Sequence, residues 1–332
     1  MKFLNDEEFT PPPGIISALK SGFDITANQV GIILFPILLD VFLWFGPRLR
    51  VENLLRTLLA QFDMLASENF IPAAELQRIQ ESIGELISLN INLFSLLRTF
   101  PIGVSSLMGQ AFPALTPLGE PNSYQIGSAF TFFLWVGGLT FFGWVFGSFY
   151  FTWVSKVTLQ DEKHDLLWAG RTVLQATMLA ILWTVTFSTI GIPLLLVFSI
   201  FMQINASLAQ IAFLLLAFFA MWIFVPIFFS AHGVFTNNEN LFRSIISSFH
   251  LSRFTLPTSS FFVISIAILS QGFNILWLTP STSSWMMLVG IFGHAFITTS
   301  LLAASFIYYR DMNVWLETLL EKLASKATSA QA

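Results

Sequence analysis

The sequence predicts an all-α, polytopic integral membrane protein with six transmembrane helices, and three observations support this fold class. Of the 332 residues, 55% are hydrophobic and only 10% are charged, whereas soluble domains carry about 25% charged residues. Apolar runs of about twenty residues, the length that an α-helix needs to cross a bilayer, recur along the chain. These runs are continuous rather than alternating with a period of two, which disfavours a β-barrel.

The composition also narrows the classes of function. The chain has no cysteine, which excludes disulfides, thiolate catalysis, iron–sulfur clusters and cysteine-based zinc sites. The net charge is −4, and no basic tract indicates binding to nucleic acid. No GxSxG, HExxH, P-loop or GxGxxG pattern occurs, and no two histidines have the i,i+4 spacing of a metal site. We therefore expect no enzyme class and no cofactor.

Residues 1–28 are expected to form a cytoplasmic segment that ends in an interfacial helix. Prolines and a glycine at residues 11–14 break regular structure, and residues 15–25 show a short helical alternation of apolar and polar side chains. The acidic, proline-rich start lacks the features of a cleavable signal peptide. The first transmembrane helix is predicted at residues 29–46 and contains Asp40.

Residues 47–125 are predicted to form an extracytoplasmic amphipathic hairpin and a surface loop. Between residues 49 and 98, leucines and isoleucines recur at intervals of three and four, which predicts two helices joined as an antiparallel pair. Asn90 is the one polar interruption of the second stripe, which continues to Leu97. Residues 99–125 are rich in Pro, Gly and Ser but still apolar, so we expect them on the membrane surface or over the helix bundle.

Transmembrane helices 2–6 are predicted within residues 126–309, and residues 310–332 form a cytoplasmic tail. The approximate helix ranges are 126–154, 172–201, 208–234, 259–278 and 285–309. Gly143 and Gly147 have the GxxxG spacing that allows close helix contact, although such glycines are also ordinary in membrane helices. The Gly-Ile-Pro sequence at residues 191–193 predicts a kink.

The charges of the short loops predict the orientation. With six spans, the N-terminus, residues 155–171, residues 235–258 and the tail share one side and carry ten lysines and arginines. The short loops on the other side, 202–207 and 279–284, carry none. Because cytoplasmic loops are enriched in Lys and Arg, we expect both termini in the cytoplasm and the protein in the cell (inner) membrane.

A polar-punctuated segment at residues 236–256 is predicted to be a separate cytoplasmic surface helix that precedes the fifth span. Thr236 and Glu239 have the spacing of a capping box, which starts a helix. Pro257 is expected to end it. The apolar face and the serine-rich opposite face indicate that the helix lies on the membrane.

The start of this segment repeats a pattern near the N-terminus. A shift of 226 residues lays residues 15–25 on residues 241–251, and residues 166–171 give a third, weaker echo. The pattern predicts a unit of surface helix, span, outer loop and returning span that is used three times. The alternative is chance recurrence in a very apolar composition.

Residues 240–253, the span after them and the sequence ASFIYYRD at residues 304–311 resemble a broad group of poorly characterised bacterial six-span membrane proteins. The group includes the membrane domain attached to some glycerophosphoryl diester phosphodiesterases. The resemblance covers about a quarter of the chain and implies the same kind of membrane fold. This sequence contains no phosphodiesterase catalytic domain, so the resemblance implies no activity.

Four polar residues within the spans form the candidate intramembrane layer, because ionisable groups inside a membrane are costly and often functional. The helix rise of about 1.5 Å per residue places Asp40 roughly 9 Å, and His294 roughly 14 Å, from the outer ends of their spans. Gln271 and Asn274 fall in the same outer third. The layer is either a pocket for a polar headgroup or a proton relay, or a packing contact in which Asp40 reaches another span or Arg48.

The remaining polar residues are interpreted as structural. His164 and His250 fall in predicted cytoplasmic loops, and His232 falls near a span end. Tyr308 and Tyr309 are expected at the membrane interface, where tyrosines are enriched.

Two functional hypotheses follow. The first is a non-enzymatic scaffold or accessory protein that binds membrane lipids or a partner membrane protein through the hairpin at residues 50–98, unless the two stripes of the hairpin only bury each other. The second is a small transporter or lipid-handling permease that uses the layer with Asp40 and His294. A closed, dry layer favours the first hypothesis, and a water-accessible cavity favours the second. A membrane enzyme ranks third.

Overall fold

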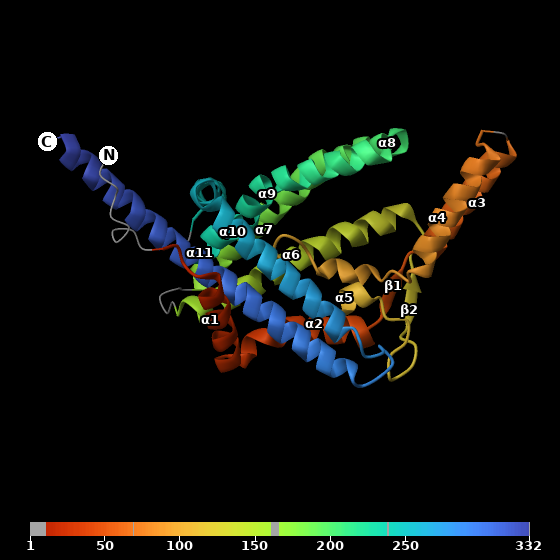
Figure 1. Cartoon of the computed structure of the whole chain (residues 1–332). Coiled ribbons are helices and arrows are strands. Elements are labelled where there is room, and N and C mark those ends of the chain that lie inside the picture. The colour runs from red at the N-terminus through yellow and green to blue at the C-terminus, as the bar shows by residue number, and fades with distance from the viewer. Residues whose placement is uncertain (1–10, 69, 161–165, 238, 332) are drawn as a thin grey trace.

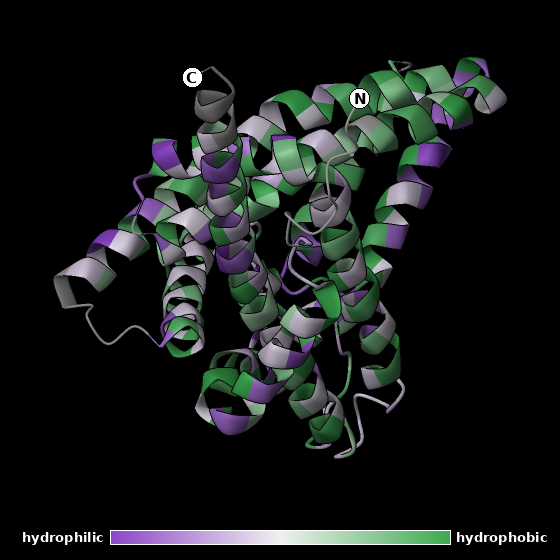
Figure 2. Ribbon diagram, turned by 60° about the vertical axis from the view of Figure 1, so that its left-hand side comes forward, coloured by the Kyte–Doolittle hydropathy of each residue, from purple (hydrophilic) through white to green (hydrophobic). Residues whose placement is uncertain are grey.

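The computed structural model describes residues 11–68, 70–160, 166–237 and 239–331, and most of them are helical (Figure 1). Five helices are long and apolar enough to cross a membrane: Ala129–Leu159, Trp168–Ile204, Ser207–Thr236, Leu241–Trp277 and Met287–Ser325. The number rises to six if the bent pair Ile15–Asn28 and Val30–Phe45 is counted as one span. Figure 2 shows hydrophobic residues distributed along the long helices. The prediction of a multi-pass helical membrane protein is confirmed at this level.

The first helix, α1 (Ile15–Asn28), is separated by a bend of 96° from the short 3₁₀ turn η2 (Val30–Ile33) and helix α2 (Leu34–Phe45). The small residues Ala18, Gly22 and Thr26 of α1 are buried. A Cβ atom on Gly22 would overlap the backbone of Ser300 and Ala304, so the glycine allows α1 to lie directly on the last helix. Of the larger apolar side chains of α1, Ile16 is exposed, whereas Ile15 and Ile25 are partly buried against the core.

The expected hairpin is present as α3 (Glu52–Ser67) and α4 (Ala73–Ser88), which projects from the end of the molecule opposite the two termini (Figure 1). Its second helix ends earlier than predicted, because Asn90 adopts a left-handed backbone with φ of 51°. The following residues form the 3₁₀ helix η3 (Leu93–Leu97), which packs on a transmembrane helix instead. Strands β1 (Arg48–Arg50) and β2 (Ser123–Gln125) pair in parallel and join the two ends of this region, a small departure from the all-α prediction.

The loop between η3 and β2 enters the helix bundle and does not lie on its surface. Ile102, Leu107 and Met108 are almost fully buried in the main apolar core, and Met108 begins the short helix α5 (Met108–Ala111). Gly143 of α6 (Ala129–Leu159) lies against the carbonyl oxygen of Leu97 at the end of η3, and Gly147 lies against the backbone of Gly103 in the loop. The GxxxG pair therefore allows a close contact, but its partner is η3 and the entering loop rather than a second transmembrane helix.

The predicted kink coincides with a turn of π-helix, η4 (Phe187–Gly191), which joins α7 (Leu166–Thr186) to α8 (Ile192–Ile204). Helix α9 (Ala206–Thr236) returns beside α8, and the two extend together beyond the rest of the bundle (Figure 1). No described residue of α8 is buried. The side chains of α8 are almost all apolar, so this arm is suited to contact with lipid.

The surface helix predicted at residues 236–256 is not a separate element, and this prediction is wrong. Helix α10 runs unbroken over Leu241–Trp277 with Pro257 inside it. Its N-cap is Asn240, whose side chain accepts a hydrogen bond from the Arg243 amide, while Thr236 is the last residue of α9. Membrane helices tolerate an internal proline because neighbouring groups satisfy the freed carbonyl.

The last helix, α11 (Met287–Gln331), also continues through most of the segment predicted as a tail. It runs through the centre of the molecule and contacts α1, α2, α6, α9 and α10. Helices α1 and α10 begin 226 residues apart, as the proposed repeat requires, and α7 begins at the third echo, Leu166. The copies differ where α1 ends at Asn28, because a bend of 96° separates it from the next helix, whereas α10 continues without a break to Trp277.

Candidate functional site

Asp40 of α2 holds the loop that enters the bundle. Its Oδ1 accepts hydrogen bonds from the Ser106 hydroxyl at 2.6 Å and the Met108 amide at 2.8 Å, and its Oδ2 accepts one from the Leu107 amide at 3.1 Å. Asp40 is 0% exposed. It does not reach Arg48, which instead donates a hydrogen bond to the carbonyl of Ala114. Each carboxylate oxygen is therefore already used within the fold.

His294 of α11 pairs with Asn274 of α10 across the bundle. The Nδ1 atom of His294 lies 2.8 Å from Oδ1 of Asn274, which can only accept, so Nδ1 carries the hydrogen. The Nε2 atom of His294 is buried without a hydrogen-bond partner. Gln271, one turn earlier on α10, is exposed. The four predicted layer residues thus form one pair, one loop anchor and one outward side chain.

Arg98, which follows η3, is a charged residue close enough to these groups to affect both. Its guanidinium acts electrostatically on both Asp40 and His294. Partial burial lowers the pKa of Arg98 below its ordinary value, and the Asp40 carboxylate acts in the opposite direction. The sequence indicated no role for Arg98, because the fold brings it back to the bundle only through the entering loop.

A cavity of about 200 Å³ lies beside this network, enclosed by α6, α9, α10, α11 and the loop at residues 100–105. Most of its wall is apolar, with Phe151, Phe228 and Leu301 among the lining residues. Five polar side chains also line it: Ser105, His232, Ser270, Thr298 and Ser305. No Asp, Glu, Lys or Arg is among the residues that line it. An apolar cavity with a few converging polar groups is the usual form of a small-molecule site.

His232 is the residue of this cavity that the sequence interpretation misplaced. It was expected near a membrane interface, yet it is only 2% exposed and packs against the rings of Phe229 and Phe306. Its Nδ1 lies 3.1 Å from the carbonyl oxygen of Phe228, and its Nε2 lies 2.7 Å from the hydroxyl of Ser305. One feature of the sequence could have indicated this position, namely a histidine that follows the long apolar run of α9.

A second, open and mostly apolar groove shares one lining residue, Phe100, with the cavity. Its other walls include Phe187 of η4 and Phe224 of α9. The rings of Phe100 and Phe187 have their centroids 6.1 Å apart. The groove therefore adds apolar surface next to the cavity.

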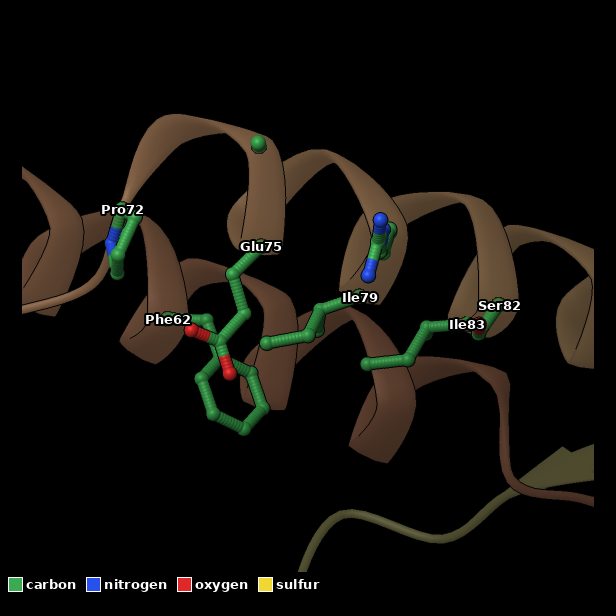
Figure 3. A pocket seen from close by; sticks show the side chains of 8 residues that line it. Phe62, Pro72, Glu75, Ile79, Ser82 and Ile83 are labelled. Carbon is green, nitrogen blue, oxygen red and sulfur yellow. The ribbon is translucent and has the colours of Figure 1, made fainter. Parts of the chain in front are cut away.

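The projecting hairpin carries a second, open groove of about 680 Å³ (Figure 3). Ile79 and Ile83 of α4 lie in line beside the Phe62 ring of α3 (Figure 3). The two helices cover each other's stripes only in part, since no described residue of α3 or α4 is buried. Large apolar side chains, including Met64 at 59% exposed, remain uncovered.

The other predicted residues have structural positions. Tyr308 and Tyr309 are 0% exposed, and the Tyr308 ring stacks on Phe262 with centroids 3.9 Å apart, so both rings belong to the protein core. His250 is exposed on α10, and His164 lies outside the described residues. Within the described ranges, no cluster of three His, Asp or Glu side chains is arranged to hold a metal.

Comparison with protein-family models, with curated proteins and with solved structures gives no match for this chain.

Proposed function

We propose that this chain is a non-enzymatic membrane protein that binds a single amphiphilic lipid molecule in the cavity beside His232. The observation that carries the proposal is the lining of the cavity, which combines a mostly apolar wall with five polar side chains. An amphiphile has the same two parts, a polar end and an apolar chain, and the groove that shares Phe100 with the cavity offers further apolar surface for that chain. Burying that chain provides the main driving force, at about 0.8 kcal/mol per CH₂ group.

Binding is favoured over transport by the state of the polar layer. All three hydrogen bonds to Asp40 come from the protein's own loop, and His294 is 1% exposed. An ion or proton pathway needs ionisable groups that water reaches. The alternative of a small transporter or permease would require the loop at residues 99–111 to leave the bundle.

Photolabelling tests the lipid site. The protein is reconstituted in nanodiscs with a single-chain alkyl diazirine probe, and the labelled residues are identified by mass spectrometry. We expect adducts on cavity residues such as Phe151 and Leu301. The variant Ser270→Trp fills the cavity from α10 and should remove them, whereas Ile268→Trp, which changes a lipid-exposed position on the same helix, should not.

The proposal fails if the adducts lie only on the exposed arm of α8 and α9 in all three proteins. It also fails if Ser270→Trp and Ile268→Trp give the same labelling as the unchanged chain, because the probe then does not enter the cavity. Thermal unfolding of both variants in the same nanodiscs checks that each one is folded.

As a second candidate function, we propose that the hairpin docks a partner membrane protein outside the bilayer. Residues 52–88 carry six carboxylates against two arginines, so an anionic membrane surface would repel them. Their exposed apolar stripe, with Leu58 and Leu86, still requires a cover. A helical partner with an apolar ridge between basic residues fits both properties.

A photo-crosslinking amino acid at Leu58 tests this docking, with the same group at the exposed Ala60 on the opposite face of α3 as the control. We expect one adduct of defined mass at Leu58, lost when Glu75→Lys and Glu81→Lys reverse the local charge. An adduct to lipid, or to a second copy of this chain, would contradict the proposal.

We further propose that the protein lies in the bacterial inner membrane with both termini in the cytoplasm. Because the chain has no cysteine, single introduced cysteines report sidedness directly. A cysteine at Ser82 on the hairpin should react with an impermeant maleimide in intact cells. A cysteine at Ser325 near the C-terminus should react only after permeabilisation, and the reverse pattern would invert the topology.

A further inference from the structure

The hydrogen-bond chemistry of the cavity wall restricts the ligand, and this inference rests on the lipid-binding function proposed above. We infer that the cavity selects an uncharged amphiphile whose polar end donates a hydrogen bond, namely a hydroxyl on an apolar chain. The inference follows from the acceptors within the protein that already take the hydrogen of each hydroxyl on the cavity wall.

Two of the hydroxyls form a chain that leads away from the cavity. The Ser105 hydroxyl donates to Oγ1 of Thr298 at 2.7 Å, and the Thr298 hydroxyl donates to the carbonyl of His294 at 2.8 Å. The other hydroxyl close to Ser105 is that of Tyr150, which is bonded to Thr299 at 2.8 Å. Ser105 and Thr298 therefore have no hydrogen left for a ligand, but their oxygens keep lone pairs.

The third hydroxyl is that of Ser305, which lies beside His232. A carbonyl oxygen can only accept, so the contact between Nδ1 and Phe228 places the ring hydrogen on Nδ1. A charged imidazolium without a carboxylate on the cavity wall would be very costly at this depth, so the ring is neutral and Nε2 can accept. The Ser305 hydroxyl therefore has two acceptors at 2.7 Å, Nε2 of His232 and the carbonyl oxygen of Leu302, and its one hydrogen is used within the wall. Ser305 likewise offers only an acceptor to the cavity.

Ser270 completes the wall and has no hydrogen-bond partner within the described part of the chain. Its hydroxyl can turn to donate or accept. The wall thus presents three acceptors, one adaptable group and no formal charge. A carboxylate or phosphate ligand, which has only acceptors, would lose its hydration and face lone pairs. A quaternary ammonium has no hydrogen to donate. A fatty alcohol or the free hydroxyl of a monoacylglycerol meets the wall with a donor.

Competition against the diazirine probe tests the inference with ligands of equal chain length. Hexadecanol should displace the probe from the cavity at about fivefold to tenfold lower concentration than hexadecyl methyl ether, the effect of one net hydrogen bond. Hexadecanoate should compete more weakly than the alcohol. A C16 monoacylglycerol is compared with hexadecanol to identify the source of the hydroxyl. If it competes at least as well as hexadecanol, the ligand is a glyceride, and if it competes less well, the ligand is a simple alcohol. Both results support the inference.

Two variants check that the wall hydroxyls are responsible. Thr298→Val keeps the side-chain shape but frees the Ser105 hydrogen, so the preference for alcohol over ether should narrow. Ser265→Ala, on the opposite side of α10, removes a hydroxyl that is bonded to Phe261 and should leave the preference unchanged. Equal competition by alcohol and ether, or stronger competition by the carboxylate, overturns the inference and leaves the lipid site intact. Unchanged labelling in Ser270→Trp would instead refute the site itself.

Discussion

Replacement of Asp40 should release the loop that fills the centre of the bundle. The carboxylate is the shared acceptor for the Ser106 hydroxyl and for the amides of Leu107 and Met108. In Asp40→Ala all three donors lose that acceptor. Ser106 can rotate toward another oxygen, whereas the two amides cannot. We therefore expect the loop to be the first part of the fold to loosen.

The magnitude follows from the number of stranded donors. A buried donor without a partner costs about 1–3 kcal/mol and a lost hydrogen bond about 1 kcal/mol, so two amides and the lost Ser106 bond give about 3–7 kcal/mol for Asp40→Ala. In Asp40→Asn the amide oxygen keeps the Ser106 and Met108 bonds, but its NH₂ group faces the Leu107 amide as a second donor. One bond is lost, and the expected cost is about 1–3 kcal/mol.

The assay combines stability and local access. Unfolding in detergent is followed by tryptophan fluorescence, and a cysteine at Ser105 in the otherwise cysteine-free chain is labelled with maleimide. The expected order of stability is the unchanged chain, then Asp40→Asn, then Asp40→Ala, with faster labelling in the same order. Asp24→Ala, at an exposed position on α1, is the control and should stay within about 0.5 kcal/mol. Wild-type stability and labelling in Asp40→Ala would refute the anchoring role.

Three further predictions concern the packing around the site. Gly147→Ala should lower the unfolding temperature, because the added Cβ atom would meet the backbone of Gly103. Gly137→Ala on the same helix has open space around it and should be neutral or slightly stabilising. Equal effects of the two substitutions would contradict the contact between loop and helix. Asn274→Ala strands Nδ1 of His294 and should cost about 1–3 kcal/mol, and a double-mutant cycle with His294→Ala that shows no coupling would exclude the pair. Replacement of residues 52–88 by a short linker should leave the bundle's unfolding temperature unchanged, since none of the described residues of α3 and α4 is buried; a large drop would show that the hairpin is structural.

The membrane class and the approximate places of the long helices could be predicted from the sequence, because both depend on local hydrophobicity. A run of apolar residues long enough to cross a bilayer has few other stable structures. The hairpin stripe at α3 and α4 was also readable, since helical periodicity is a local property. The same local reasoning misjudged Pro257, whose effect depends on the neighbours that satisfy the freed carbonyl.

The candidate site was decided by tertiary structure. Inside the bundle a polar group must find a partner, and sequence spacing does not reveal which partner it finds. Asp40 bonds to Ser106, 66 residues away, and His232 bonds to Ser305, 73 residues away. The polar residues of the spans were visible in the sequence, but Asp40 became a loop anchor and His232 a cavity wall only through these long-range pairings. The apolar composition thus determined that the helices are suited to a lipid bilayer. The tertiary structure determined which polar groups have no partner within the protein and remain available to a ligand.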